Sequence, residues 1–401
     1  MLPPGWTMKG LLELAEIRSG QVDPRLPKYR DMPLIAPDHI EAGTGRLLAI
    51  RSAREQGAIS GKYVVDPGDV IYSKIRPNLM KVHQSQFSAL CSADMYPMKP
   101  RAGVDGRYLA SVLLGPRFTS FAIGESMRSG IPKINRDALT GYELPVPPKP
   151  EQKAIGHALN NADQLIMALE RLIAKKRDVK HGLMQELLIG RTRLPGFTGE
   201  WQEVTLGELG VFFKGRGIRR DDVRASGIPC IRYGELYTTH RNYTRTTVSF
   251  VDSDVAATAL PIRAGDILFA GSGETKAEIG MAAAYVGTSN AVAGGDIIVL
   301  RGRGFDPVFL GSLLNAPSLA AHKARLGQGD AVVHIGAAAL GSLPFRLPGH
   351  EEQAAIASVL QDADAEIEAL ECRLESARAV KVGMMQELLT GRTRLPVEED
   401  A

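Results

Sequence analysis

One stretch of the sequence occurs twice. Residues 151–195 read EQKAIGHALNNADQLIMALERLIAKKRDVKHGLMQELLIGRTRLP, and residues 352–396 read EQAAIASVLQDADAEIEALECRLESARAVKVGMMQELLTGRTRLP. At a constant offset of 201 the two copies align without a gap and agree at 26 of 45 positions. Chance does not produce such agreement, so the chain carries an internal duplication with a period of half its length.

Each copy predicts a long helix with a coiled-coil seam. Apolar residues recur at alternating steps of four and three, which gives a narrow stripe rather than a broad core-facing side. The seam residues are Ile155, Leu159, Ile166, Leu169 and Ile173 in the first copy, and Ile356, Leu360, Ile367, Leu370 and Leu374 in the second. Lys176, Lys180 and Lys381 also occupy seam positions, so we expect the seam to weaken there. Gly190 and Gly391 are placed as C-terminal caps.

A helix of about 40 residues would be roughly 57 Å long at about 1.5 Å per residue. A lone amphipathic helix of that length needs a partner for its seam, and the other copy is the obvious one. We therefore predict that the two helices pair as an antiparallel coiled coil. Two separate surface helices on two ordinary domains are the alternative.

Composition limits the class of protein. The chain has 401 residues, of which 44% are hydrophobic, and a net charge of only +3, so any affinity for nucleic acid must come from local patches. The three cysteines, Cys91, Cys230 and Cys372, form no C-x-x-C pair, which argues against a disulfide framework or a structural zinc site. No apolar run has the length of a signal peptide or a membrane span, so we expect a soluble cytoplasmic protein.

The segments between the helices are distant copies of one fold. Both open on a tryptophan, Trp6 and Trp201, and Gly68–Tyr72 corresponds to Gly265–Phe269, each a turn that enters a short apolar strand. Short strands, many Gly and Pro turns and brief helices predict mixed α/β (α+β) domains in a pseudo-two-fold repeat. The predicted boundaries are 1–147 and 196–347 for the globular domains, 148–195 for the central helix, and 348–401 for the C-terminal helix with an acidic tail.

The difference in divergence suggests a division of labour. The two helices stayed alike, we infer, because both do the same structural work, whereas the globular segments drifted because each reads something different. Residues 44–81 hold seven basic and three acidic residues, and residues 211–250 hold eight basic and three acidic ones with interleaved tyrosines. Arginine suits forked bonds to guanine edges and phosphates. These clusters favour DNA binding, and a solvated basic surface without function is the alternative.

Motifs for catalysis are weak. Gly271–Lys276 resembles a phosphate loop, but it lacks the Lys directly after the last Gly and the Ser or Thr that follows. Asp266, Glu274 and Lys276 imitate a nuclease metal site, although the spacing is tight and no second acidic cluster supports it. The histidines show no metal-ligand spacing. We predict a binding protein that performs no chemistry and holds no metal.

The arrangement resembles the specificity (S) subunit of type I restriction-modification systems, in which two target-recognition domains alternate with two conserved helical regions. Motif wording typical of that family occurs at Gly68–Pro77 and Gly265–Glu274, and at Pro147–Leu159 and again at Pro348–Leu360. The resemblance covers essentially the whole chain. A very short region before Trp6 and the absence of an extra helix after the second copy are departures from it.

The resemblance implies a mechanism in phage defence. Each recognition domain would read one half of a bipartite, asymmetric DNA site, and the coiled coil would set the spacer length. Two methyltransferase (M) subunits that bind S-adenosylmethionine would methylate DNA, and restriction (R) subunits would use ATP and Mg²⁺. This chain would hold no cofactor, would scaffold both partners and would not itself be an enzyme.

The candidate DNA-binding residues follow from the basic clusters and the family motifs. They are Lys74, Arg76, Lys81, Arg128 and Lys133 in the first domain, and Arg216, Arg219, Arg220, Arg232, Tyr233, Lys276 and His334 in the second. We expect partner contacts on helix faces outside the seam, including Met184, Leu188, Met385 and Leu389, unless these pack on their own domains. Two rival functions are an orphan DNA-binding adaptor of another phage-defence complex and a nuclease that uses Asp266.

Overall fold

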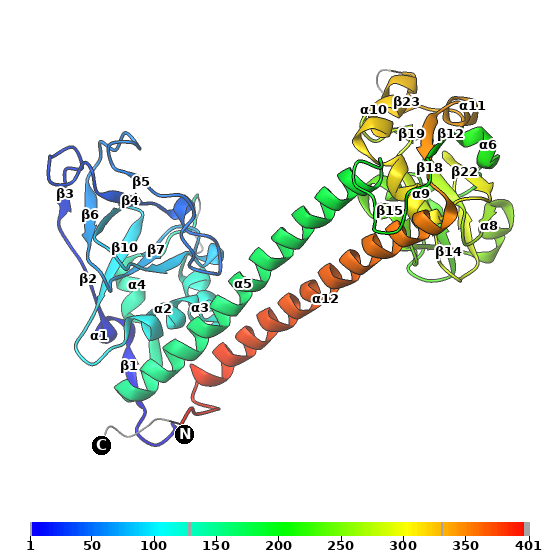
Figure 1. Cartoon of the computed structure of the whole chain (residues 1–401). Helices are drawn as coiled ribbons and strands as arrows, with labels where there is room; N and C mark the ends of the chain where they lie inside the picture. Colours follow the sequence, from blue (N-terminus) through cyan, green and yellow to red (C-terminus); the bar gives the residue numbers. More distant parts are fainter. Residues whose placement is uncertain (1, 127–129, 330–331, 397–401) are drawn as a thin grey trace. The chain divides into compact units, whose positions relative to one another are not determined.

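The structure is a computed structural model that describes residues 2–126, 130–329 and 332–396. It divides into two compact units (Figure 1). Unit 1 comprises Met1–Arg171 and Glu371–Ala401, and unit 2 comprises Leu172–Leu370. Each long helix is shared between the units, so the four predicted segments do not coincide with them, and their boundaries stay a prediction.

The two long helices form as expected. Helix α5 spans Lys149–Leu187 and helix α12 spans His350–Leu388, each with 39 residues. Both end on a glycine with left-handed backbone, Gly190 at φ 71° and Gly391 at φ 73°. In both, the residue after this glycine donates its N–H to the carbonyl of Glu186 or Glu387. These bonds satisfy carbonyls that the helix end would leave unpaired.

The helices run antiparallel within unit 1. Lys381 Nζ donates to Asp163 Oδ1 at 2.5 Å, and Arg378 Nη2 donates to Glu170 Oε1 at 2.8 Å. The residue number therefore rises along α5 as it falls along α12. Unit 2 has the same direction, because Lys176 pairs with Glu366 at 2.6 Å and Lys180 with Asp364.

The three seam lysines pair with carboxylates of the facing helix, and the expectation that lysines weaken the seam stays a prediction. Lys381 is buried and bonds Asp163, and Lys180 is bonded to Asp364, the residue equivalent to Asp163 in the second copy. An opposite charge on the facing helix satisfies each ammonium group, so the seam continues through these layers as paired charges. Buried polar pairs of this kind commonly specify the register of a coiled coil at a cost in stability.

The globular part of unit 1 is built on two main sheets, in the orders β2-β10-β7-β8 and β3-β6-β9-β4-β5, with β1 paired to β11. Within it β4 and β9 are parallel, whereas β7 and β10 are antiparallel. Its strands are β1 Thr7–Gly10, β2 Ala15–Ile17, β3 Gln21–Val22, β4 Pro33–Ile35, β5 Arg51–Ser52, β6 Lys62–Val65, β7 Val70–Ser73, β8 Val82–Gln84, β9 Ala89–Cys91, β10 Met95–Pro100 and β11 Glu143–Val146. Its helices are α1 Leu11–Leu14, α2 Gly106–Leu114, α3 Pro116–Ser126 and α4 Arg136–Thr140.

The globular part of unit 2 repeats that plan, with sheets in the orders β13-β22-β18-β20-β15 and β16-β14-β21-β17, and with β12 paired to β24 and β19 to β23. Again one pair of the second sheet, β14 and β21, is parallel. Its strands are β12 Gln202–Thr205, β13 Gly210–Lys214, β14 Ile228–Ile231, β15 Asn242–Thr244, β16 Ser249–Val251, β17 Leu260–Ile262, β18 Ile267–Ala270, β19 Ser272–Gly273, β20 Ala282–Tyr285, β21 Ala291–Ala293, β22 Ile297–Gly302, β23 Val333–His334 and β24 Pro344–Leu347. Its helices are α6 Leu206–Leu209, α7 Glu235–Thr238, α8 Ser253–Thr258, α9 Pro307–Leu314, α10 Pro317–Leu326 and α11 Ala337–Gly341. The prediction of two α+β segments separated by long helices is confirmed.

The ends of the long helices belong to the globular cores. Ile155 and Leu159 of α5 and Met385 and Leu388 of α12 lie in the main core of unit 1. In unit 2, Leu187, Leu188, Ile356 and Leu360 likewise lie in the main core. The first two predicted seam residues of each copy thus pack on a globular core. Leu188 and Met385 are buried in the chain itself, so the alternative that they pack on their own domains holds.

A buried carboxylate fixes the start of each long helix. In unit 1, Glu151 accepts from the Trp6 indole Nε1 at 3.0 Å and from two nitrogens of Arg394 at 3.0 and 2.7 Å. In unit 2, Glu352 accepts from two nitrogens of Arg193 at 2.5 and 2.7 Å. The duplicated RTRLP ending therefore has a structural use, because its second arginine clamps the beginning of the other helix.

Among the described residues, no helix is long and apolar enough to cross a membrane.

Candidate nucleic-acid interface

Three predicted residues of unit 1 meet at the end of its central strand. Strand β7 is fully buried and leads directly into Lys74. There the chain meets a segment more than fifty residues later, because Ile134 N donates to Lys74 O at 2.9 Å and Arg76 N donates to Pro132 O at 2.8 Å. Lys133 lies opposite Ile75 in the same bridge. The structure therefore brings Lys74, Arg76 and Lys133 together.

The geometry of Arg76 sets it apart from ordinary loop residues. Its backbone has φ 49°, in the left-handed region that few residues other than glycine adopt. Its side chain is exposed. A guanidinium group suits recognition of a phosphate or base edge, and the backbone contacts above place Arg76 close to Lys133 and two residues after Lys74.

An aromatic ring underlies this cluster. Lys74 Nζ lies 5.4 Å from the centroid of the Tyr96 ring, and the Arg136 guanidinium carbon lies 5.8 Å from it. The Tyr96 hydroxyl donates to Ile134 O at 3.3 Å. Burial lowers the pKa of Lys74, and the nearby Lys133 and Arg136 lower it further. An anion bound here would relieve this repulsion. Sequence reasoning missed Tyr96 and Arg136, although Arg136 stands three residues after the predicted Lys133.

Two other predicted residues of unit 1 do not join the cluster. Lys81 Nζ donates to the carbonyl of Pro37 at 2.5 Å, so its ammonium group holds two loops of the domain together. Arg128 lies outside the described residues.

Unit 2 repeats the same junction with different chemistry. Strand β18 ends before Gly271, whose carbonyl accepts from Ile335 N at 3.0 Å. The next residue, Ser272, pairs with His334 between β19 and β23, and its hydroxyl lies 2.8 Å from His334 Nδ1. The predicted residue His334 thus occupies the place that Lys133 has in unit 1, with a hydroxyl and an imidazole in place of two cations.

A second group of predicted residues lines a groove of about 1140 Å³ in unit 2. Arg220, Arg232 and Tyr233 contribute to it, together with Tyr237 and Arg241, which the sequence reasoning did not single out. The loop that carries Lys276 also borders it, through its neighbours Thr275 and Ala277. Arg216 and Arg219 are exposed in the loop that precedes Arg220.

The groove is less basic than the sequence count suggested. Four acidic residues line it, Glu235, Glu274, Glu278 and Asp296, and three of these come from segments outside residues 211–250. Arg232 Nε donates to the buried Glu235 at 2.8 Å, so that cation is already paired. A lining of mixed charge offers acceptors as well as donors to base edges, whereas a purely basic lining would offer donors alone.

The acidic residue proposed for a nuclease site is otherwise engaged. Asp266 is buried, and its carboxylate accepts from Arg301 Nη2 at 2.6 Å and from Arg263 N at 2.8 Å. Asp69 of unit 1 is likewise bonded to Arg18. Within the described part of the chain, no group of three His, Cys, Asp or Glu side chains is placed to hold a metal ion.

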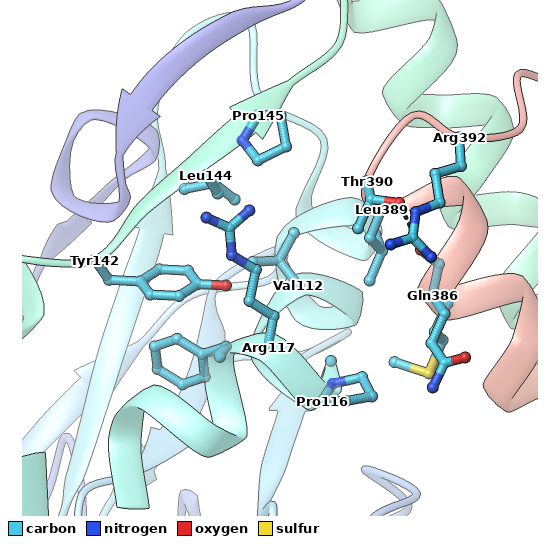
Figure 2. Close-up of a pocket in the computed structure, with 13 residues that line it drawn as sticks. Val112, Pro116, Arg117, Tyr142, Leu144, Pro145, Gln386, Leu389, Thr390 and Arg392 are labelled. Carbon is cyan, nitrogen blue, oxygen red and sulfur yellow. Dashed lines mark hydrogen bonds between the residues drawn. The ribbon is translucent and has the colours of Figure 1, made fainter. Parts of the chain in front are cut away.

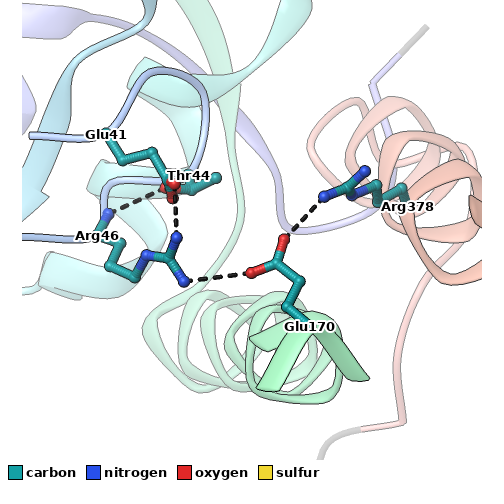
Figure 3. Close-up of polar contacts among 5 residues, drawn as sticks. All are labelled: Glu41, Thr44, Arg46, Glu170 and Arg378. Atoms are coloured by element: carbon teal, nitrogen blue, oxygen red, sulfur yellow. Dashed lines mark hydrogen bonds and ion pairs between the residues drawn. The ribbon is translucent and has the colours of Figure 1, made fainter. Parts of the chain in front are cut away.

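A chain of ion pairs fastens a loop of the globular part of unit 1 to both long helices (Figure 3). Arg46 donates to Glu41 at 2.5 Å and to Glu170 of α5 at 3.2 Å, and Glu170 also accepts from Arg378 of α12. A hydrogen bond from the Thr44 hydroxyl lowers the pKa of Glu41, with help from Arg46. Partly exposed pairs contribute little energy each, but together they orient the loop on the helices.

Comparison with known proteins agrees with this geometry. Residues 3–177 match the family model described as the type I restriction modification DNA specificity domain. Residues 3–177 therefore carry this specificity domain. The specificity subunit of the Escherichia coli type I restriction enzyme EcoDI is 30% identical over 205 residues, which cover 50% of this chain and 44% of that protein. The Methanocaldococcus jannaschii MjaVIII specificity subunit is 24% identical over 295 residues, 69% of this chain and 68% of that one.

Solved structures extend the likeness in fold to the whole chain. The HsdS subunit from Thermoanaerobacter tengcongensis has a TM-score of 0.55 at 20% identity, with 98% of both chains covered. A chain from a structural study of complex assembly and conformational transition of the type I R-M system has a TM-score of 0.63 at 19% identity, with 98% of this chain and 100% of that chain covered. At these identities the likeness concerns the specificity-subunit fold alone.

Proposed function

We propose that this chain is a specificity subunit and that it reads a bipartite DNA site for a type I restriction-modification complex. Each globular part would read one half-site, and the chain would carry no catalysis of its own. The observation that carries this proposal is the repeated junction at the end of the central strand. In unit 1 it gathers Lys74, Arg76 and Lys133, and in unit 2 it gathers Ser272 and His334.

The two junctions share a backbone but differ in side chains, which is what two different half-sites require. Cations on the Tyr96 ring suit phosphates and guanine edges. The Ser272 and His334 pair, with the mixed-charge groove nearby, suits a different set of donors and acceptors. The assignment of these residues to contacts with bases or with phosphates is part of the proposal.

The paired helices would act as a spacer. A helix of 39 residues is about 58 Å long, and one turn of DNA is about 34 Å, so the helices are long enough to span an unread gap between half-sites. The chain would also scaffold its partners. DNA methylation would belong to two methyltransferase subunits that bind S-adenosylmethionine, and translocation and cleavage to restriction subunits that use ATP and Mg²⁺.

Methylation mapping tests this proposal. The chain is co-expressed with a candidate type I methyltransferase subunit, and methylated adenines are mapped across the cellular DNA. Two short half-sites around a fixed unread gap are the expected result. DNA binding by the chain without such a motif would point instead to an adaptor of another defence complex and would remove the spacer role from the helices.

A further inference from the structure

A second groove of unit 2, of about 760 Å³, lies where the globular part of that unit meets both long helices. Residues 239–246, which include β15, line it on the globular side, and α5 and α12 line it on the other side. We name this surface the helix groove. Four cationic side chains line it against two carboxylates, so its lining is basic; the cations are Arg177, Lys180, Arg241 and Arg245, and the carboxylates are Asp364 and Glu368.

One carboxylate fastens the globular side of the helix groove to the helices. Asp364 of α12 is bonded through Oδ1 to Lys180 of α5, and its Oδ2 accepts from the Tyr243 hydroxyl at 3.0 Å. Burial raises the pKa of Tyr243, and the neighbouring Asp364 raises it further, so the hydroxyl keeps the proton that it donates. The charge of Asp364 is balanced by Lys180 and therefore does not compensate the arginines of the loop.

The two arginines on either side of Tyr243 have no counter-ion. Arg241 and Arg245 are exposed, and neither guanidinium forms an ion pair with a carboxylate in the part of the chain that the structure describes. The Arg245 guanidinium carbon lies 5.8 Å from the centroid of the Tyr243 ring, so the ring that anchors the loop also supports this cation. Uncompensated cations gathered in a groove favour an anionic ligand.

Arg241 connects the helix groove to the groove of about 1140 Å³ described above, because its side chain lines both. The larger groove carries Arg220, Arg232 and Tyr233, and the proposed function assigns it to DNA. A polyanion that occupies the larger groove can continue past Arg241 into the helix groove. This continuity points to DNA as the occupant, rather than to an isolated small anion.

The equivalent groove of unit 1 has a different charge. It measures about 430 Å³ and is lined by Asp163 of α5, which corresponds to Asp364 at the offset of 201. Three carboxylates and two arginines line it. Two of these carboxylates, Glu41 and Glu170, both bind Arg46 (Figure 3). This excess of carboxylates disfavours a phosphate group, so the basic lining belongs to unit 2 and is not a shared property of the repeat.

A smaller pocket of unit 1, where the end of α12 meets the globular part, also differs from the helix groove (Figure 2). It measures about 380 Å³, and apolar side chains such as Leu389 make up most of its lining. Arg117 lies beside Tyr142 in this pocket, and Arg392 pairs with Glu387 at 3.7 Å. Arg117 is an exposed arginine outside the surfaces assigned to DNA, which makes it a suitable control.

We propose that the helix groove binds the phosphate backbone of the DNA immediately beside the half-site of unit 2, on its spacer side, through Arg241 and Arg245. The spacer side follows because the groove is formed in part by the helices that would span the spacer. Phosphates carry no sequence information, so these contacts would position the DNA without reading a base. The inference rests on the proposed function and adds contacts outside both half-sites, in one unit only.

Salt titrations of DNA binding test the charge of the helix groove. The full chain binds a duplex that carries the bipartite motif obtained by methylation mapping. Arg245→Gln is expected to reduce the slope of log affinity against log salt by about 1, and the double variant with Arg241→Gln by about 2. Replacement of both arginines by lysine keeps the two charges and is expected to keep the slope. Arg117→Gln in unit 1 is the control and is expected to keep it too.

Neutral phosphates locate the contact along the DNA. In one duplex, methylphosphonates replace the spacer phosphates next to one half-site, and in a second duplex they replace those next to the other half-site. The unaltered chain is expected to lose affinity for one of these duplexes only. The double variant, Arg241→Gln with Arg245→Gln, is expected to bind that duplex as well as it binds the unmodified one, because the charges that met those phosphates are gone.

Each other outcome contradicts a particular step. Both arginines are exposed, so the melting temperature of the double variant is expected to be unchanged and its binding reports on charge alone. An unchanged salt slope in the double variant overturns the helix groove and leaves the proposed function standing. A reduced slope without sensitivity to the spacer methylphosphonates places both arginines within the half-site and also overturns the inference. An unaltered chain that does not distinguish the bipartite duplex from one with a scrambled half-site overturns the proposed function and the helix groove with it.

Discussion

The buried pair of Lys381 and Asp163 offers the sharpest test of how the long helices are held together. Lys381→Leu leaves the Asp163 carboxylate in the seam without its counter-ion. The Lys381 side chain is only 10% exposed, whereas that of Asp163 is 29% exposed. Removal of one partner of a fully buried pair costs about 3–5 kcal/mol, and partial access of water to Asp163 lowers the expected loss to about 2–4 kcal/mol.

The double variant, Lys381→Leu with Asp163→Leu, should behave very differently. Burial raises the pKa of Asp163 even though Lys381 donates to it, so the desolvation of the carboxyl outweighs the attraction of the pair. Replacement of both residues by leucine removes that desolvation and extends the apolar seam. The double variant is expected to match or exceed the stability of the unaltered chain.

Urea unfolding followed by circular dichroism measures both effects as a change in the free energy of unfolding. Lys180→Leu in unit 2 is expected to reproduce the loss, because Lys180 is bonded to the equivalent Asp364. Lys176→Leu is the matched control, since the Lys176–Glu366 pair is more exposed and is expected to be worth less than about 1 kcal/mol. A loss below about 1 kcal/mol for Lys381→Leu would refute the reasoning. A double variant whose loss of stability equals the sum of the losses of Lys381→Leu and Asp163→Leu, each measured alone, would refute it too.

Three further predictions follow from individual contacts. Trp6→Phe removes the indole N–H that bonds Glu151. In urea unfolding this variant is expected to lose about 1–2 kcal/mol more stability than Trp201→Phe, because the Trp201 N–H has no hydrogen-bond partner among the described residues. Equal losses for the two variants would contradict this. Burial lowers the pKa of Lys323 to about 7, so above that pH the folded chain holds fewer protons than the unfolded chain, and the stability of unit 2 should rise between about pH 7 and pH 10. Lys323→Met should abolish that rise in thermal melts. A rise that persists in the variant would count against Lys323 as its source. Arg76→Ala is expected to reduce the slope of log affinity against log salt by about 1 in DNA-binding titrations. Arg25, in another loop, is paired with Asp23, and Arg25→Ala should leave the slope unchanged. Unaltered DNA binding of Arg76→Ala at low salt would remove Arg76 from the interface.

Much of the fold could be predicted because its signals are local. The alternating steps of three and four residues between apolar positions predicted both long helices, and the duplicated glycines Gly190 and Gly391 predicted where they end. The Gly-Asp turns before β7 and β18 indicated that the central strands begin there.

The candidate site was predictable only in part, because its members come together across long stretches of sequence. Lys74 and Lys133 meet through a β-bridge that neither segment encodes alone. The acidic residues Glu274 and Asp296 line the groove of Arg232 from loops outside residues 211–250, so a charge count over that segment overestimated its basic character. Tyr96 joins the site only because the fold places its ring against the Lys74 ammonium group.

The sequence by itself determined the duplication, the two long helices with their caps, the central strand of each globular part and the family resemblance, because all of these depend on residue spacing along one chain. Only the tertiary structure decided where each polar side chain finds its partner. Lys81 turned inward to the Pro37 carbonyl, and Lys381 found Asp163 on the other helix. Periodicity tells which face of a helix is buried, but the partner of a buried charge is set by whichever distant segment the fold places against it, and that is a property of the folded chain as a whole.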